Sequence, residues 1–338
     1  MIDTPTDLSV PPVSTSTTGA AQGRATHGFL FVFLDGVGLG AADPTRNPLV
    51  STTLFGLWRL SGAARWTSTR FASGGRGDVC LRALDARMRV RGLPQSGTGQ
   101  ASLFTGINCA RLAGRHYGPY PHSQTRAAIR ESNVFTQVLS RGGSVAFANA
   151  FPPAFFEQAR RRDRWSVTTR CCLDAGVRVR STSEIAQGTA VPADLTGLGL
   201  ARRDPAVAAQ SESDSARSLA VIAGNHSFTL FEYFLTDEAG HRQDMEHAQT
   251  VLRSLDQFFL QLGRVLDFER TTLVVTSDHG NIEDLSTRSH TQNPVPLMAR
   301  GWAANAFAGA SSLTDVTPAI VASLGSLGAA APGARGVS

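Results

Sequence analysis

Positions 29–38 of this 338-residue chain carry the sequence FLFVFLDGVG. Six consecutive apolar residues are typical of a central strand that is buried on both faces of a parallel sheet. The run stops abruptly at Asp35-Gly36, where a carboxylate and a turn-forming residue replace the apolar side chains. We therefore expect a buried strand with Asp35 at its carboxyl end.

Two later segments have the same pattern. Residues 228–234 are apolar and aromatic and precede Asp237, and residues 272–276 form another apolar run that precedes Asp278-His279. The stretch between these two segments, roughly 244–266, has apolar residues at helical spacing. A strand, a long helix and a second strand indicate an α/β fold with a mostly parallel sheet flanked by helices. Open sheets of this class place their functional sites just beyond the strand ends.

The composition excludes several classes of protein. Hydrophobic residues make up 42% of the chain, so a sizeable core is expected and global disorder is not. All 32 basic residues are arginine, and the absence of lysine excludes Schiff-base enzymes and P-loop nucleotide-binding proteins. The net charge of +5 is scattered, which fits a small anionic substrate and does not indicate nucleic-acid binding. No apolar run of about 18 residues predicts a membrane span, and without a signal-like N-terminus we expect a cytoplasmic location by default.

Changes in composition along the chain also predict a division into segments. Residues 1–26 are rich in Ser, Thr, Pro, Gly and Ala and are expected to form a disordered leader. The remaining segments are expected to be a core made of 27–110 and 213–328, an inserted substrate-facing α+β cap at 111–212, and a flexible tail at 329–338.

Ligand-type side chains follow the predicted strands. They are Asp35, Asp237, His241, Asp278, His279 and His290. Carboxylate oxygens and imidazole nitrogens together suit Zn²⁺ or Mn²⁺ better than Ca²⁺. Asp237 and His241 are four residues apart, so one helical turn would present both on the same side. Six such residues exceed the needs of one ion, and we interpret them as ligands of two divalent cations.

The segment GLPQSGTGQ at 92–100 contains the candidate nucleophile, Ser96. Small residues surround this serine, and a helix is expected to follow it. A hydroxyl at a helix N-terminus, with backbone N–H groups facing outward, would meet a phosphate group well. The alternative interpretation is that Ser96 or Thr98 only caps that helix.

One motif is excluded by its spacing. Residues 36–40, GVGLG, follow a strand as a dinucleotide-binding loop would, but the spacing is G-x-G-x-G, and Asp35 would repel a pyrophosphate.

Four motifs resemble one known family. They are Asp35-Gly36-Val37-Gly38, Asp237-x-x-Gly240-His241, Thr276-Ser277-Asp278-His279-Gly280-Asn281-x-Glu283 and His290-Thr291-x-Asn293-Pro294-Val295-Pro296. In this order they resemble the metalloenzyme branch of the alkaline phosphatase superfamily, which includes cofactor-independent phosphoglycerate mutase and phosphopentomutase. The resemblance covers roughly residues 28–110 and 213–325. It implies an alkaline-phosphatase-like core.

The resemblance also implies a role for each residue. Asp35, Ser96, Asp278 and His279 would hold one metal ion, and Asp237, His241 and His290 would hold the other. Ser96 would be both a ligand and the nucleophile, because the family's nucleophile lies three residues before a glycine, here Gly99. It would form a phosphoserine and pass the phosphoryl group to another hydroxyl, as in a mutase, or to water, as in a phosphatase or phosphodiesterase.

This chain departs from the family pattern in places that bear on the substrate. Gln100 stands where the mutases have histidine, and the cap cannot be matched residue by residue, so a glycerate substrate is not implied. The candidate substrate contacts are Thr98, Gln100, Arg115 and His116, although the segment 114–119 could equally be a hinge. The arginine cluster at 160–164 is interpreted as a solvated surface.

Four functions are compared with these residues. The leading hypothesis is a mutase-like phosphotransferase that acts on a small phosphorylated metabolite, and the second is transfer of the phosphoryl group to water. A non-catalytic metal-binding module is disfavoured, because all seven proposed ligand positions carry competent side chains. A sulfatase is disfavoured, because the nucleophile segment lacks the C-x-P-x-R or S-x-P-x-R pattern. The sequence does not predict the oligomeric state.

Overall fold

The structure is a computed structural model that describes residues 27–329, except Arg70, Ala72, Ser73, Asp163, Arg203 and Pro205. The expected leader at 1–26 and all but the first residue of the expected tail at 329–338 lie outside the described residues.

A seven-stranded sheet in the order β2-β3-β10-β9-β1-β8-β4 forms the centre of the molecule. Its strands are β1 (Gly28–Leu34), β2 (Gly74–Arg76), β3 (Val79–Leu84), β4 (Val145–Phe147), β8 (Phe228–Tyr233), β9 (Thr271–Thr276) and β10 (Val295–Arg300). The strands β9, β1, β8 and β4 run parallel, and β10, β3 and β2 add an antiparallel edge. The expected strands at 29–34, 228–234 and 272–276 are thus confirmed, and they are neighbours in the sheet.

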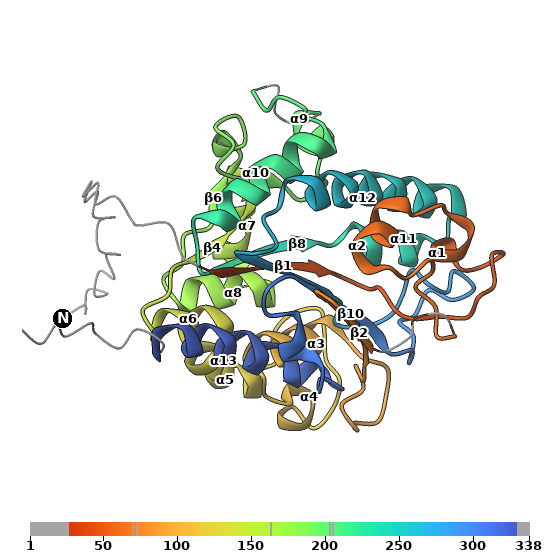
Figure 1. The fold of residues 1–338 in the computed structure, drawn as a ribbon, viewed down its shortest axis with the longest axis horizontal. Helices are drawn as coiled ribbons and strands as arrows, with labels where there is room; N and C mark the ends of the chain where they lie inside the picture. The colour runs from red at the N-terminus through yellow and green to blue at the C-terminus, as the bar shows by residue number, and fades with distance from the viewer. Residues whose placement is uncertain are drawn as a thin grey trace, which may run out of the picture.

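Helices cover both faces of this sheet (Figure 1). On one side lie α1 (Pro48–Ser51), α2 (Phe55–Ser61), α10 (Glu212–Gly224), α11 (Leu235–Arg242) and α12 (Met245–Val265). On the other side lie α3 (Ser96–Thr105), α4 (Cys109–Leu112), α5 (Arg126–Ser132), α6 (Val134–Leu139), α8 (Val167–Asp174) and α13 (Val316–Ala329). Short 3₁₀ turns occur at Ser123–Thr125, Thr182–Glu184, Ala304–Phe307 and Leu313–Asp315. Among the described helices, none combines the length and the hydropathy needed to cross a membrane.

The continuous apolar run of β1 is explained by these two helical layers. Leu30, Val32 and Leu34 belong to the hydrophobic cluster on the α12 side, whereas the phenylalanines at 29, 31 and 33 belong to the cluster on the α3 and α13 side. Alternate side chains of a strand point to opposite faces, so a strand covered on both faces needs apolar residues throughout. The fold class expected from the sequence, a mostly parallel sheet flanked by helices, is confirmed.

The middle of the chain is divided between this core and a smaller unit. β4 pairs with β8, and buried residues of α5, α6 and α8 belong to the same hydrophobic cluster as Phe31. A second, three-stranded sheet contains β5 (Asn149–Phe151), β6 (Arg180–Ser181) and β7 (Val191–Pro192), and the helices α7 (Pro153–Arg162) and α9 (Leu198–Ala201) lie in the same part of the chain. A cap at 111–212 stays a prediction, and these contacts would confine it to a shorter segment.

Candidate metal centre

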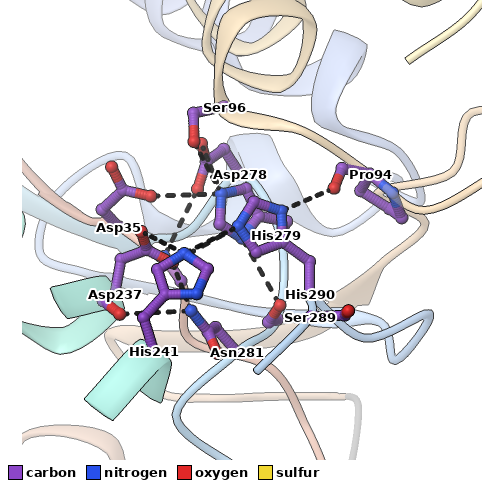
Figure 2. Close-up of polar contacts among 12 residues, drawn as sticks. Asp35, Pro94, Ser96, Asp237, His241, Asp278, His279, Asn281, Ser289 and His290 are labelled. Carbon is purple, nitrogen blue, oxygen red and sulfur yellow. Dashed lines mark hydrogen bonds and ion pairs between the residues drawn. The ribbon is translucent and has the colours of Figure 1, made fainter. Parts of the chain in front are cut away.

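The parallel strands bring the predicted ligands together. β1 lies between β8 and β9, so Asp35, which follows β1, lies between the residues that follow its two neighbours. Asp237 is on α11 directly after β8, and Asp278-His279 follow β9. Figure 2 shows these side chains, with Ser96, His241 and His290, converging on one place.

The first group of side chains contains Asp35, Asp278, His279 and Ser96. The Nε2 atom of His279 lies 3.3 Å from Oδ1 of Asp35, 3.5 Å from Oδ2 of Asp278 and 2.9 Å from Oγ of Ser96. Asp35, Asp278 and His279 are all buried, and their ligand atoms lie within 4.8 Å of one another. This spacing would allow one small cation to contact all three.

The second group contains Asp237, His241 and His290. The Nε2 atom of His241 lies 3.3 Å from Oδ2 of Asp237 and 3.3 Å from Nε2 of His290, and the latter atom lies 3.6 Å from Oδ1 of Asp237. The expected helical turn is present, because Asp237 and His241 both lie on α11. The side chain of His241 is 44% exposed, whereas those of Asp278 and His279 are fully buried, so this group is the more open to solvent.

His279 lies between the two groups. Its ring stacks on that of His290 with 3.7 Å between centroids, and its ligand nitrogen is also within 4.8 Å of ligand atoms of Asp237 and His290. The sequence-based hypothesis gave His279 to the first group only. The Nε2 atom can coordinate one ion, and its short distances to Asp35, Asp278 and Ser96 favour the first group.

Two observations indicate that a cation fits this site. Oδ1 of Asp35 and Oδ2 of Asp278 are buried and share Nε2 of His279 as their one nearby positive group, so two buried carboxylates face a single counter-charge among the described residues, a state that a bound cation would relieve. In addition, Nδ1 of His241 and Nδ1 of His290 each lie 2.8 Å from a backbone carbonyl, that of Arg288 and that of Pro94. A donor at Nδ1 leaves Nε2 unprotonated and directed into the site, as metal-binding histidines require.

The charges of this centre shift several pKa values. Burial raises the pKa of Asp35, and burial together with the charge of Asp35 raises that of Asp278. Burial alone would lower the pKa of His279, but the carboxylates of Asp278 and Asp35 outweigh it and raise this pKa to about 10. Burial and the neighbouring charge of His279 lower the pKa of His290 to about 4. At neutral pH, His290 is therefore ready to coordinate a metal, and His279 carries a proton that a metal must displace.

These shifts predict that metal binding depends on pH. A cation that coordinates His279 competes with its proton at every pH below about 10. We expect the affinity for Zn²⁺ or Mn²⁺ to fall about tenfold per unit decrease of pH from 8 to 6 for each proton displaced. Titration calorimetry in two buffers of different ionisation enthalpy would count these protons. Release of no proton at pH 7 would contradict the assignment of His279 as a ligand.

The structure changes the interpretation of the nucleophile segment. Ser96 is the first residue of α3, and Gln95 is the N-cap, so Ser96 does not cap the helix and its Oγ faces His279. The side chain of Thr98 does not cap α3 either. Its Oγ1 accepts a hydrogen bond from Tyr117 N at 3.1 Å, outside the helix. The expectation that the backbone N–H groups face outward is wrong for Thr98, whose N–H donates to Tyr117 O at 2.9 Å.

The four candidate substrate contacts have different surroundings. Thr98 holds the loop at Tyr117, and Gln100 is buried and donates from Nε2 to Oδ2 of Asp35 at 3.2 Å. His116 lies 3.4 Å from the carbonyl of Val90. Arg115 is exposed and lies over the ring of Tyr117. Gln100 therefore contacts a predicted metal ligand, and none of the four side chains forms a hydrogen bond or ion pair with Ser96. Substrate binding by them stays a prediction.

Asn281 and Glu283 hold the predicted metal ligands in position, although both were quoted above only as members of a sequence motif. Nδ2 of Asn281 donates to Oδ1 of Asp237 at 2.6 Å. The buried carboxylate of Glu283 accepts hydrogen bonds from Gly38 N and Asn281 N at 2.9 and 2.8 Å, and from the side chains of Thr291 and Asn293. It joins the three loops that carry Asp35, His279 and His290. A side chain at position 38 would not fit, since a Cβ there would lie 2.2 Å from Oε1 of Glu283.

Replacement of Glu283 tests this positioning role. In Glu283→Gln one acceptor oxygen becomes a donor that faces donors, so at least one loop should lose its anchor. We expect metal affinity to fall about 10- to 100-fold, the usual effect of losing a partner that orients metal ligands. Titration with Mn²⁺ or Zn²⁺ measures this effect, and Glu269→Gln at an exposed site is the control. Unchanged affinity with a lower melting temperature would show that Glu283 supports only the fold.

Comparison with known proteins agrees with this geometry. The family model described as Metalloenzyme superfamily matches residues 204–326, a segment that includes Asp237, His241, Asp278-His279 and His290. The resemblance to the metalloenzyme branch of the alkaline phosphatase superfamily is confirmed for this segment. Asp35 and Ser96 lie outside it.

Phosphoglycerate mutases are among the curated proteins of similar sequence. The 2,3-bisphosphoglycerate-independent phosphoglycerate mutase of Dinoroseobacter shibae is 28% identical over 124 residues, which is 35% of this chain and 24% of that protein. The protein of the same description from Legionella pneumophila is 27% identical over 113 residues, 31% of this chain and 22% of that protein. The chain thus matches about a quarter of the length of these curated relatives.

Among solved structures, the PH0037 protein of Pyrococcus horikoshii aligns with a TM-score of 0.56 over 89% of this chain and 98% of that chain, at 11% identity. This likeness supports the fold over nearly the whole chain.

Proposed function

We propose that this chain is a metal-dependent phosphoryl-transfer enzyme that acts on a small phosphate ester through a phosphoserine at Ser96. The observation that carries the proposal is the position of the Ser96 hydroxyl, 2.9 Å from Nε2 of His279 and at the start of α3. A serine needs a neighbouring group to become a nucleophile, and Ser96 has a cluster of carboxylates and imidazoles beside it.

Two divalent cations, Mn²⁺ or Zn²⁺, fit the donor set. Asp35, Ser96, Asp278 and His279 would hold one, and Asp237, His241 and His290 would hold the other. When bound, such ions neutralise phosphate charge and lower the pKa of a coordinated hydroxyl. Gln100, Asn281 and Glu283 would keep the ligands in place through the hydrogen bonds described above.

The chain's own residues would then perform two transfers. Oγ of Ser96 attacks phosphorus while the bond from phosphorus to the ester oxygen breaks, and the leaving oxygen takes up a proton. In the second transfer the bond between Oγ and phosphorus breaks as an acceptor attacks, and Ser96 regains its proton. The acceptor is a second hydroxyl of the substrate in a mutase and water in a phosphatase. The similarity to phosphoglycerate mutases supports the first acceptor, and the partly exposed second group supports access of water.

A screen of the metal-loaded protein against phosphorylated metabolites tests this proposal. Both free phosphate and isomerised product should be measured. Isomerised product without free phosphate would identify a mutase, and steady phosphate release from many esters a phosphatase. Absence of turnover with either ion across the panel would contradict the proposed function.

A further inference from the structure

A mostly apolar cavity lies beside the metal centre. It has a volume of about 510 Å³, within the range of small-molecule sites. Its walls include Phe151, Phe155, Leu200, Phe234 and Leu235. The rings of Phe151 and Phe155 are stacked with 4.3 Å between their centroids, and Phe234 is 39% exposed. An exposed aromatic ring in a concave apolar surface indicates a place for a ligand.

Helix α11 connects this cavity to the proposed metal ligands. Phe234 and Glu238 line the cavity, and Asp237 and His241 belong to the metal centre. The i,i+4 spacing puts Phe234 and Glu238 on one stripe of the helix, and Asp237 and His241 on the neighbouring stripe. The cavity and the metal centre therefore lie on adjoining faces of α11.

The sheet places the cavity at the same edge as the metal centre. Asn149, the first residue of β5, forms two hydrogen bonds with the backbone of Glu232 near the carboxyl end of β8. β5 leads directly into Phe151 and α7 on the cavity wall. The cavity therefore lies near the carboxyl end of β8, the strand that leads into α11 and its ligands Asp237 and His241.

The charges that line the cavity disfavour an anionic ligand group. Among the described residues that line it, none is arginine, lysine or histidine. Both carboxylate oxygens of Asp194 accept hydrogen bonds from backbone N–H groups, those of Gly197 and Gly199, at 2.7 and 2.8 Å, and Glu238 pairs with Arg242. A carboxylate or second phosphate of a substrate would meet two acidic side chains here, and among the described lining residues no cation to pair with.

We propose that this cavity binds the non-transferred group of the phosphate ester, and that this group is uncharged and apolar, an alkyl or aryl group. The inference rests on the proposed function and gives it a substrate class. Such a group offers no second hydroxyl, so water is the acceptor. The first transfer breaks the ester P–O bond and releases the alcohol, which takes the proton of Ser96. Water then breaks the bond between Oγ and phosphorus, which yields inorganic phosphate and restores the serine hydroxyl.

A series of n-alkyl phosphates from ethyl to octyl tests the proposal, since their leaving groups have similar intrinsic reactivity. We expect kcat/KM of the metal-loaded protein to rise about two- to fourfold per methylene until the cavity is filled. The variant Ala154→Glu adds a carboxylate at an exposed helical position on the cavity wall and should remove most of this dependence. The matched control, Ala127→Glu on α5, changes an exposed helical alanine outside the cavity and should keep the dependence.

Binding measured by calorimetry with the same esters separates this inference from the proposed function. Chain-length-dependent binding that Ala154→Glu removes would support the cavity even if no ester is turned over. Turnover that is independent of chain length would overturn the cavity proposal and leave phosphoryl transfer intact. Binding that is independent of chain length in an inactive protein would overturn both.

Discussion

The variant Ser96→Ala is expected to lose at least about 10³-fold in kcat/KM toward any phosphate ester that the wild-type protein turns over. Without Oγ no phosphoserine can form, and direct attack by water has no prepared nucleophile. Metal binding should survive, because five carboxylate and imidazole ligands besides His279 remain. The measurement is turnover of the best ester of the panel, together with the metal-dependent rise in melting temperature.

Two further results decide the role of Ser96. Brief exposure of the wild-type protein to a ³²P-labelled ester, followed by acid quenching, should leave label on Ser96 and none on the alanine variant. Ser140→Ala, a serine on an exposed helix end, is the control and should retain full activity. Unchanged turnover by Ser96→Ala, with metal still bound, would contradict the assignment of Ser96 as the nucleophile.

The strand ends of this site could be predicted because they depend on local patterns. The apolar run before Asp35 and the runs before Asp237 and Asp278 each predicted a buried strand, and parallel strands must share a carboxyl edge. The four-residue spacing of Asp237 and His241 similarly required only one helical turn. These features follow from residues that are close in the sequence.

The contacts that refine the site depend on residues that are far apart in the sequence. Gln100 was predicted as a substrate contact and not as a partner of Asp35, and its hydrogen bond to Asp35 crosses 65 positions. Glu283 reaches Gly38 across 245 positions. The position of His279 between the two ligand groups depends on the stacking of two rings from different loops. No spacing rule contains such information.

The middle of the chain shows a different limit. β4 has three residues, Val145–Phe147, which is too short for any periodicity to distinguish it from a loop. Its pairing with β8 nevertheless draws the surrounding helices into the core. The predicted cap at 111–212 rests on composition and on mixed short helix and strand signals, and neither reports which strand pairs with which.

The variant Asp278→Asn should separate metal binding from folding. Asp278 is fully buried, one of its oxygens has no hydrogen-bond partner, and burial with the charge of Asp35 raises its pKa. A carboxyl whose pKa is higher in the folded than in the unfolded protein destabilises the fold at any pH above the unfolded pKa. The amide removes this penalty, and loss of the attraction to His279 offsets part of the gain. We expect the metal-free variant to melt at or above the wild-type temperature at pH 7.

The same change should remove most of the stabilisation by metal. A ligand present at 1,000 times its Kd stabilises a protein by about 4 kcal/mol, and an amide is a much weaker ligand than a carboxylate. Asp256→Asn is the matched control, because Asp256 on α12 is also buried but accepts a hydrogen bond from Leu57 N at 2.9 Å and belongs to neither ligand group. It should keep the full metal-dependent increase in melting temperature. A residue that serves only as a metal ligand has little effect on the melting temperature without metal, and its loss removes most of the stabilisation by metal. A metal-free Asp278→Asn protein that melts well below the wild type would therefore show that this carboxylate serves the fold rather than the metal.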